Sequence, residues 1–538
     1  MKISKLEIRN FRSIKHLILE PRSLCAIIGP NSVGKTNILK AIDLVLGEGW
    51  TTKAKVAREL FYDIREPVII EIYFDPPVEY YYIDKKGIEG KKIVNSIRLE
   101  MRLEPELFVK TTINNGDDFY YQENFKKQCH FIYIPANRDL TDELRVSQWT
   151  LLGKLMKAIH ENYLRIYGGD EDKLRNDFAD KIKPAKEFLE DDFDKDSRTI
   201  TFKKFKDTFQ KYCKMNSAGL ANEFVPELNI YNLNWFYKTL QIHIKEDFCE
   251  KYFDAEEVGS GMKNLLLISL FQTYAELMGG KVIFGIEEPE SFLYPNAQRG
   301  LYNSFRELSK RTQIFYTTHS PNFIDAYYAY EIDILQKTKE KGTIVLQKNK
   351  EYLTEETAER EKFRIYTQFN TERNELFFAR KVILVEGPSD KILWATICKE
   401  RWNINLDEKG VSIIECGGKG GVNYFVGICG LVGINDYFAI WDEDSEEEYN
   451  PRKDWLVEVK NNGKGIEIPG KLETFLGLPA GKEAQKVKNA YEWAINENNE
   501  IPELFLKVKD FLEKENILEQ SNSNTIVQLD VDKDNLSF

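Results

Sequence analysis

Apolar and polar residues alternate in two stretches of the N-terminal region. Ile3, Leu6 and Ile8 are separated by charged side chains, and residues 96–103 alternate strictly. A period of two is typical of a strand that buries one face. We therefore predict that residues 1–140 are rich in β-strands with one early helix. The opening pattern also lacks the continuous apolar core of a signal peptide.

Further along the chain the period changes to that of a helix. Apolar side chains recur every four residues from Leu151 to Tyr163, and every three or four residues from Phe202 to Tyr212. These spacings predict two amphipathic helices, the second with lysines on its polar side. We interpret residues 144–225 as a helical insertion between two halves of a β-containing domain. It is a candidate oligomerisation element, and an arm that stabilises the head is the alternative.

Short apolar runs in the last third of the chain alternate with stretches long enough to form helices. The runs lie at 382–385, 411–414 and 437–441, and their order predicts βαβ units around a parallel sheet. The charged stretch at 337–373 is typical of a linker with a connecting helix. The chain is thus predicted to be an α/β protein. Its predicted segments are 1–143, 144–225, 226–336, 337–373 and 374–538.

Composition and charge exclude several classes of protein. The 538 residues suffice for roughly three to four domains. With 75 basic and 87 acidic residues the net charge is −12, which excludes a wholly basic nucleic-acid coat but permits a local basic channel. Candidates for that channel are the lysines at 203–211 and 482–488. No apolar run approaches the roughly 18 residues that a membrane span needs.

Cysteine and histidine usage narrows the chemistry. The seven cysteines show no CxxC spacing, which argues against a zinc ribbon or a disulfide framework and favours free thiols in the cytoplasm. The five histidines all lie at or before His319. Any metal chemistry beyond that residue must therefore use carboxylates.

The strongest motif is the glycine-containing loop at 29–36. It follows an apolar run at 24–28 and precedes a helical pattern at 37–46, the strand–loop–helix order of a phosphate-binding loop. Its backbone N–H groups would face a phosphate, Lys35 would reach the β- and γ-oxygens, and Thr36 would hold Mg²⁺. A chance glycine-rich turn is the alternative. The candidate nucleotide ligands here are Asn31, Gly34, Lys35 and Thr36.

Three further segments carry polar residues where such a site needs them. The apolar run at 282–286 ends in Glu287, which could join a magnesium shell, and Glu288, which could polarise the attacking water. An acidic capping cluster is the alternative. A second apolar run delivers His319 at its end. Ser260 and Gly261 precede an apolar helix whose exposed N–H groups could bind a phosphate.

Together these motifs resemble the ABC-type ATPase head of SMC-like DNA-repair ATPases. The resemblance implies that Glu287 occupies the Walker B position, that Glu288 is the catalytic base, and that His319 is the switch histidine. Ser260 and its glycines match the signature motif, which implies that two heads sandwich ATP as a dimer. Glu287 departs from the commoner Asp, and Asp63 lies roughly where a glutamine loop is expected.

A second constellation of carboxylates follows the apolar runs of the last segment. Glu386 and Asp390 follow the first run, and Asp442 and Asp444 follow the third. Strand ends of a parallel sheet share one edge, so these groups are expected to converge. Clustered carboxylates favour Mg²⁺ or Mn²⁺, and two such ions can stabilise both oxygens of an in-line phosphoryl displacement. A solvated acidic loop at 442–448 is the alternative.

This pattern resembles the TOPRIM fold, and the whole chain resembles the OLD (overcoming-lysogenisation-defect) family of ATPase–nucleases, which includes the nuclease of the Gabija anti-phage system. The segments at 133–139, 149–152 and 375–379 support the resemblance. The family's later acidic site implies that Glu473 is a further metal ligand. An assisting lysine is also implied, with Lys482 preferred over Lys486, and metal-activated water would be the nucleophile.

The leading prediction is an ATP-regulated, divalent-metal-dependent DNA endonuclease or nickase of anti-phage defence, acting in the cytoplasm with ATP and Mg²⁺ or Mn²⁺ as cofactors. Predicted partners are double-stranded DNA, a second copy in a homodimer or tetramer through heads and insertion, and a helicase or noncoding RNA of a defence system. A TOPRIM ribonuclease acting on tRNA or structured RNA is one alternative. A non-catalytic ATPase sensor that docks a partner is the other.

Overall fold

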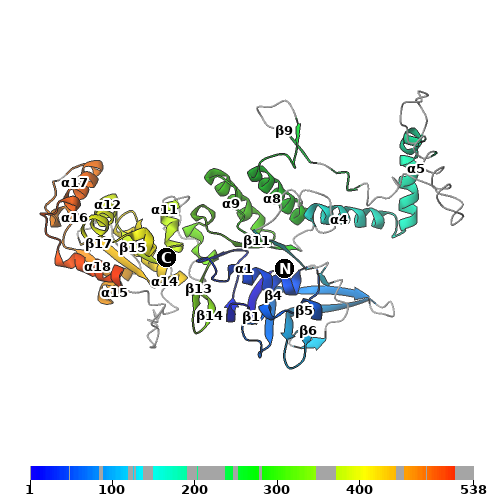
Figure 1. Cartoon of the computed structure of the whole chain (residues 1–538), viewed down its shortest axis with the longest axis horizontal. Coiled ribbons are helices and arrows are strands. Elements are labelled where there is room, and N and C mark those ends of the chain that lie inside the picture. The colour runs from blue at the N-terminus through cyan, green and yellow to red at the C-terminus, as the bar shows by residue number, and fades with distance from the viewer. Residues whose placement is uncertain are drawn as a thin grey trace. The chain divides into compact units, whose positions relative to one another are not determined.

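A computed structural model gives the fold of the chain (Figure 1). It describes residues 2–47, 49–83, 89–114, 116–118, 125–126, 129–136, 150–190, 203, 207, 237–240, 242–245, 252–277, 282–346, 371–443, 454–479 and 481–514. The chain divides into two compact units: unit 1 is Met1–Ala136 with Met278–Phe538, and unit 2 is Asn137–Leu277.

Unit 1 contains a twelve-stranded sheet in the order β7-β6-β5-β4-β1-β2-β14-β13-β3-β12-β11-β8. Strands β13, β3, β12, β11 and β8 are parallel neighbours, whereas the strands from β7 to β2 pair antiparallel. Parallel strands need crossover connections, and the loop at 29–36 lies in the connection that follows β3. The strands are β1 (Ile3–Phe11), β2 (Ile14–Leu19), β3 (Leu24–Ile28), β4 (Val68–Ile83), β5 (Glu89–Arg102), β6 (Phe108–Ile113), β7 (Asp117–Asp118), β8 (His130–Ile134), β11 (Val282–Glu287), β12 (Gln313–Thr317), β13 (Ile332–Thr338) and β14 (Gly342–Leu346).

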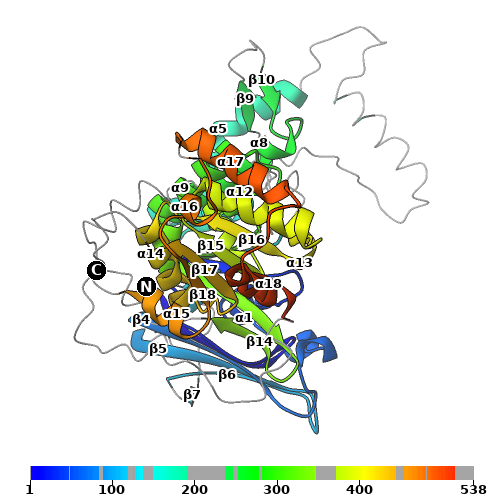
Figure 2. The same cartoon turned by 90° about the vertical axis from the view of Figure 1, so that its left-hand side faces the viewer.

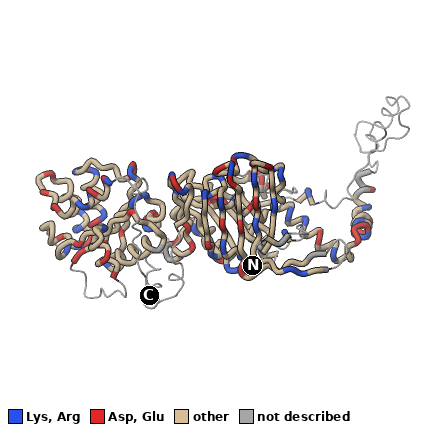
Figure 3. Tube along the Cα trace, turned by 90° about the horizontal axis from the view of Figure 1, so that it is seen from below, with Lys and Arg blue, Asp and Glu red and all other residues tan. Residues whose placement is uncertain are grey.

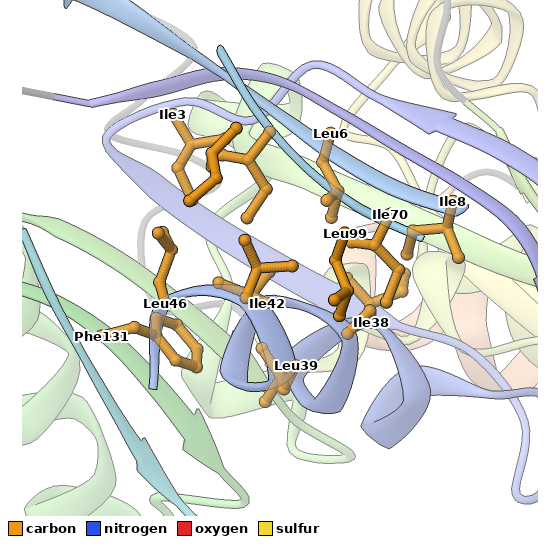
Figure 4. Packing of buried hydrophobic residues seen from close by; sticks show 14 of the residues in the cluster. Ile3, Leu6, Ile8, Ile38, Leu39, Ile42, Leu46, Ile70, Leu99 and Phe131 are labelled. Atoms are coloured by element: carbon orange, nitrogen blue, oxygen red, sulfur yellow. The ribbon is translucent and has the colours of Figure 1, made fainter. Parts of the chain in front are cut away.

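Helix α1 (Lys35–Leu46) packs its apolar side on this sheet. Figure 4 shows Ile38, Ile42 and Leu46 of α1 among side chains from β1, β4 and β5, and all belong to one buried cluster. Burial of this many aliphatic side chains fixes the start of α1, and with it the phosphate loop, relative to the strands. The other helices of the large-sheet region are η1 (Lys53–Lys55), η2 (Arg58–Leu60), α9 (Pro295–Ser309), η3 (Pro321–Phe323) and η4 (Ala326–Glu331).

The structure differs from the sequence prediction at 337–373. Strand β14 lies inside this stretch and forms an antiparallel hairpin with β13, turning at Gly342. Charged residues flank a strand of only five residues, so the run is too short to stand out as a periodic pattern. Gly342 has a φ of 67°, and a Cβ there would lie 2.5 Å from the carbonyl oxygen of Ser13, so glycine is required at this crossing.

The C-terminal region (residues 371–514) of unit 1 holds a separate parallel sheet in the order β16-β15-β17-β18 (Figure 2). The predicted apolar runs at 382–385, 411–414 and 437–441 are the strands β15, β16 and β17, which confirms the βαβ prediction. Helices α12, α17 and α18 bury one face of this sheet, whereas α14 and α15 pack against the other. The elements are α11 (Thr371–Asn374), η6 (Glu375–Phe377), β15 (Lys381–Val385), α12 (Pro388–Thr396), η7 (Ile397–Arg401), α13 (Leu406–Lys409), β16 (Val411–Glu415), α14 (Lys419–Val432), β17 (Tyr437–Asp442), α15 (Trp455–Asn461), β18 (Gly465–Ile468), α16 (Leu472–Phe475), α17 (Glu483–Ile495), η8 (Glu503–Phe505) and α18 (Leu506–Glu513).

Unit 2 is mainly helical in its described parts. The predicted helix from Leu151 is α4 (Leu151–Ile166), which Thr150 caps by accepting a hydrogen bond from the Gly153 backbone. The predicted helix from Phe202 to Tyr212 lies outside the described residues, apart from two isolated positions. The remaining elements are α5 (Glu171–Glu190), α8 (Ser260–Leu277), β9 (His243–Lys245) and β10 (Tyr252–Asp254).

Basic and acidic residues are interspersed along the described chain (Figure 3). This distribution agrees with the prediction that any basic surface is local rather than general. Among the described helices, none combines the length and apolarity that crossing a membrane requires.

Candidate functional site

The nucleotide motifs lie at the carboxyl ends of three neighbouring parallel strands. Strand β3 leads into the phosphate loop, β11 ends at Glu287, and β12 ends two residues before His319. The register pairs Glu287 with Thr317, and Thr317 with Ile27 of β3. Segments that are far apart in the sequence therefore meet at one edge of the sheet, as ligand sites of such sheets do.

The phosphate loop has a backbone conformation that requires glycine at position 34. Gly34 caps α1 with a φ of 108°, and a Cβ there would lie 2.7 Å from the side-chain oxygens of Ser13 and Thr343. Lys35 is buried and its Nζ donates to the carbonyl oxygens of Gly29 (2.9 Å) and Pro30 (3.0 Å). Burial lowers the pKa of Lys35, and the three glutamates at 287, 288 and 290 oppose that shift. Lys35 therefore lies within the electrostatic reach of the acidic cluster, as the predicted site requires.

Glu287 and Glu288 differ in burial and in backbone conformation. Glu287 is buried, and its Oε2 accepts a hydrogen bond from the Ala136 backbone at 3.0 Å. Glu288 is partly exposed and has a φ of 43°, a left-handed conformation that is unusual for a side chain with a Cβ. Backbone strain of this kind clusters at functional sites. The burial of Glu287 and the partial exposure of Glu288 are compatible with the roles predicted for them, a magnesium-shell residue and the group that polarises the attacking water.

His319 lies beside Glu288, with 4.0 Å between Nε2 and Oε1. Burial and the charge of Lys35 lower the pKa of His319, and Glu288 opposes the shift. The imidazole is therefore neutral at pH 7 and can act as a hydrogen-bond donor or acceptor. Sequence reasoning placed these residues at strand ends, and the structure brings them together.

Glu290 is a residue that the sequence analysis did not single out. Its Oε1 accepts hydrogen bonds from the Thr318 hydroxyl (2.6 Å) and the His319 backbone (2.9 Å), and its side chain is buried. Burial raises the pKa of Glu290. Glu290 therefore fixes the backbone that carries His319. Its position two residues after Glu288 pointed to a role in the site. Its partner Thr318 lies 28 residues away in the sequence, so spacing alone could not reveal that role.

The other predicted nucleotide residues have different surroundings. Asn31 is exposed, and Thr36 is half-buried in the first turn of α1. Ser260 and Gly261 begin helix α8, which belongs to unit 2. Asp63 pairs with Arg65 at 2.7 Å between Oδ2 and Nη2, and hydrogen bonds from Arg65 lower the pKa of Asp63 to about 2.

A carboxylate cluster lies at the carboxyl ends of the central strands of the C-terminal sheet. Glu386 directly follows β15 and Asp442 ends β17, and these strands are parallel neighbours. The Asp442 backbone N–H donates to Glu386 Oε1 at 2.8 Å, which joins the two strand ends. The Leu472 backbone N–H donates to both carboxylate oxygens of Asp442 at 3.2 Å. The convergence that parallel strands predict is thus present for these two residues.

Asp390 completes this cluster from the first turn of α12. It is buried, and its Oδ2 accepts a hydrogen bond from the Gly387 backbone at 3.2 Å. Burial raises the pKa of Asp390 well above its usual range, and the charges of Asp442 and Glu386 raise it further. Burial also raises the pKa of Asp442 to about 6. Asp444, the other predicted ligand of this edge, lies outside the described residues.

These residues fit a divalent cation. Their donors are all carboxylate oxygens, which divalent cations such as Mg²⁺ prefer. Burial is the main cause of the raised pKa values of Asp390 and Asp442, and neighbouring carboxylates add to both shifts. Within the described residues no three acidic, histidine or cysteine side chains already form a metal cage. The hydrogen bonds at Glu386 and Asp442 would therefore have to rearrange when a cation binds.

Lys486 and Lys419 border the cluster. Lys486, one turn into α17, pairs with Glu473 at 2.8 Å, and Glu473, Asp442 and Asp390 raise the pKa of Lys486. Lys482, the lysine preferred from the sequence, is exposed at the N-terminal end of the same helix. The contacts therefore bring Lys486 to the carboxylates, and which of Lys482 and Lys486 assists cleavage stays a prediction. The Nζ of Lys419 donates to the carbonyl oxygen of Asp442 at 3.2 Å.

The raised pKa values predict how metal binding depends on pH. Below about pH 6 a proton on Asp442 competes with the cation, so the Mn²⁺ affinity of the nucleotide-free protein should fall by about tenfold per pH unit for each proton displaced. In the metal-free protein, folding stability depends on pH in the opposite direction. The folded state holds a proton that the unfolded state releases, so stability falls as pH rises from about 4 to about 6.

Calorimetric Mn²⁺ titrations at pH 5, 6, 7 and 8 test this dependence. Asp442→Asn is the matched variant: it removes one titrating ligand, so it should weaken Mn²⁺ binding and make its pH dependence less steep, while Asp390 still titrates. An Mn²⁺ affinity that stays constant between pH 5 and pH 7 would contradict the assignment.

The fold and its motifs define a phosphate-loop ATPase domain joined to a TOPRIM domain. The chain matches the family model "AAA ATPase domain" at residues 1–100 and 78–324, and the model "Overcoming lysogenization defect protein-like, TOPRIM domain" at residues 377–444. It therefore belongs to the OLD family of enzymes, which combine an AAA-type ATPase domain with a TOPRIM nuclease domain.

Individual relatives cover most of the chain. The OLD nuclease of Thermus scotoductus is 26% identical over 470 residues, which cover 82% of each chain. Endonuclease GajA of Bacillus cereus is 24% identical over 435 residues, which cover 78% of this chain and 71% of that protein. A solved Smc head bound to the C-terminal winged-helix domain of ScpA has a TM-score of 0.38 and 18% identity, and covers 64% of this chain and 97% of that chain.

Proposed function

We propose that this enzyme is an ATP-regulated, divalent-metal-dependent endonuclease that cuts or nicks double-stranded DNA. The observation that carries the proposal is the meeting of Glu386, Asp390 and Asp442 at one edge of the C-terminal sheet. The names of two relatives, OLD nuclease and endonuclease GajA, support the same reaction class. Its proposed setting is the bacterial cytoplasm, in defence against phage.

At the C-terminal site, Glu386, Asp390 and Asp442 would hold the cation, with Asp444 and Glu473 as further ligands. A bound divalent cation supplies an activated water and stabilises the charge that develops on the scissile phosphate. Lys486 brings a positive charge to the same edge, and Glu473 orients it. Lys471 acts electrostatically on Asp442, and Lys482 and Lys488 are exposed; these lysines would contact a nucleic-acid backbone, so binding should weaken steeply with salt.

At the nucleotide site, Lys35 would bind the β- and γ-phosphate oxygens, with Asn31 and Gly34 in the same loop. Thr36 and Glu287 would hold Mg²⁺. Glu288 would accept a proton from the attacking water, and the neutral His319 beside it would orient the γ-phosphate. We propose that Ser260 and Gly261 bind the nucleotide of a second copy, so that ATP joins two heads.

An assay on two substrates tests the proposal. Supercoiled plasmid and total tRNA are incubated with the full-length protein and Mn²⁺ or Mg²⁺, with and without ATP. We expect metal-dependent conversion of plasmid to the open-circular or linear form, which chelation with EDTA stops. Cleavage of tRNA alone would replace the proposal with a ribonuclease. Cleavage of neither substrate would favour a non-catalytic sensor.

A further inference from the structure

Helix α11 lies between the two sites. It is four residues long (Thr371–Asn374) and is followed by η6 and then β15, the strand that leads to Glu386. Its residues make hydrogen bonds in two directions, to the loop that follows His319 and to the end of β16. Arg373 and Asn374 are both buried.

The first set of contacts holds the loop after His319. The Nδ2 of Asn374 donates to the carbonyl oxygens of Pro321 and Ile324, each at 2.8 Å. The Oδ1 of Asn374 has no partner among the described residues, so the two carbonyls alone dictate the orientation of this amide. The Thr371 hydroxyl donates to Asn322 Oδ1 at 2.8 Å.

The same loop is held from its other end by the nucleotide site. Glu290 accepts the backbone N–H of His319, and the backbone N–H of Glu288 donates to the Thr317 carbonyl oxygen at 3.0 Å. A change at Glu288 or His319 therefore acts on a segment whose next residues are fixed to α11.

The second set of contacts reaches the carboxylate site. The Nε of Arg373 donates to the carbonyl oxygen of Glu415, the last residue of β16, at 2.8 Å. Two residues later the backbone N–H groups of Gly417 and Gly418 both donate to the carbonyl oxygen of Glu386 at 2.9 Å. Arg373 is thus hydrogen-bonded to the segment whose next residues, Gly417 and Gly418, position the backbone of Glu386.

We propose that Arg373 and Asn374 are positioning residues that couple the nucleotide state to the carboxylate site. Asn374 and Thr371 sense the loop after His319, and Arg373 passes its displacement to the turn that holds Glu386. The two sets of hydrogen bonds come from adjacent residues of one short helix. A shift of one loop therefore either moves the other or breaks hydrogen bonds that are buried or partly buried. This inference rests on the proposed function for what the coupling regulates.

Such coupling is reciprocal and must show as a difference between nucleotide states. The full-length protein is compared with and without a non-hydrolysable ATP analogue by two measurements. One is hydrogen exchange of the backbone amides at 411–418, and the other is the ratio of plasmid cleavage rates. The variants are Asn374→Ala, and Thr371→Val, which keeps the shape of threonine and removes only its hydroxyl.

For the wild type we expect the analogue to change the cleavage rate by about fivefold or more, the usual size of such coupling, and to alter exchange at 411–418. In Asn374→Ala and Thr371→Val both responses should shrink toward none, while analogue binding and ATP hydrolysis persist. Thr371→Ser retains the hydroxyl, and Glu372→Gln alters only the exposed pair with Lys391, so both should keep the wild-type response.

Two results would overturn the inference: no exchange response in the wild type, or a wild-type response in both Asn374→Ala and Thr371→Val. If Asn374→Ala fails to fold, Thr371→Val alone decides. The proposed nuclease function fails separately. If the wild type cleaves nothing while the exchange response is present and lost in the variants, the coupling stands and the nuclease assignment falls.

Discussion

Glu386→Gln should abolish DNA cleavage and leave ATP hydrolysis unchanged. Glu386 is the carboxylate that follows β15, and its Oε1 already joins it to the end of β17. Glutamine keeps the size of the side chain but removes the negative charge that a divalent cation needs. Loss of several kcal/mol of transition-state stabilisation corresponds to a fall in rate of about 10³-fold.

The measurement is plasmid nicking with Mn²⁺, together with phosphate release from ATP by the same preparation. Glu408→Gln is the matched control, because Glu408 lies exposed on α13 of the same region and away from the cluster. Nicking by Glu386→Gln at the wild-type rate would remove Glu386 from the site. A parallel loss of ATP hydrolysis would point to a general folding defect instead.

The sequence was sufficient for those parts of the fold that local patterns encode. The apolar runs at 382–385, 411–414 and 437–441 are strands, and the loop at 29–36 joins a strand to a helix as predicted. Convergence of Glu386 and Asp442 followed from the rule that parallel strands end at the same edge. These predictions needed only a period, a motif and one rule of topology.

Other features depend on tertiary contacts and left no local pattern. Glu290 acquires its role from Thr318 and His319, which directly follow another strand, β12. Helix α11 is one turn long, too short for a helical period to be visible. The stretch at 337–373 conceals β14 because flanking charges dilute its apolar residues.

Lys482 and Lys486 illustrate what the position of a helix start adds to a sequence spacing. Spacing alone could not separate Lys482 from Lys486, because both follow Glu473 closely. Helix α17 begins at Glu483, so Lys482 lies outside its first turn while Lys486 lies within the helix and meets Glu473. Helix boundaries are the least certain part of a sequence prediction, and this one places Lys486 against Glu473, while the role of either lysine in cleavage stays a prediction.

Lys35→Ala should abolish ATP hydrolysis and remove the response of cleavage to ATP. Lys35 is buried at the start of α1, and its ammonium lies within the electrostatic reach of Glu287, Glu288 and Glu290. Alanine removes the cation that would balance the β- and γ-phosphate charges. The loss of one preorganised donor of this kind typically costs about 10²- to 10³-fold in kcat.

Phosphate release and binding of a fluorescent ATP analogue measure the effect, and nicking without nucleotide is followed in parallel. Lys40→Ala is the matched control, since Lys40 lies on the same helix beyond the phosphate loop. Nicking without nucleotide should persist in Lys35→Ala, because the carboxylate cluster is built on a different sheet. ATP hydrolysis at the wild-type rate would contradict the phosphate-loop assignment, and loss of nucleotide-free nicking would show that the two sites cannot work independently.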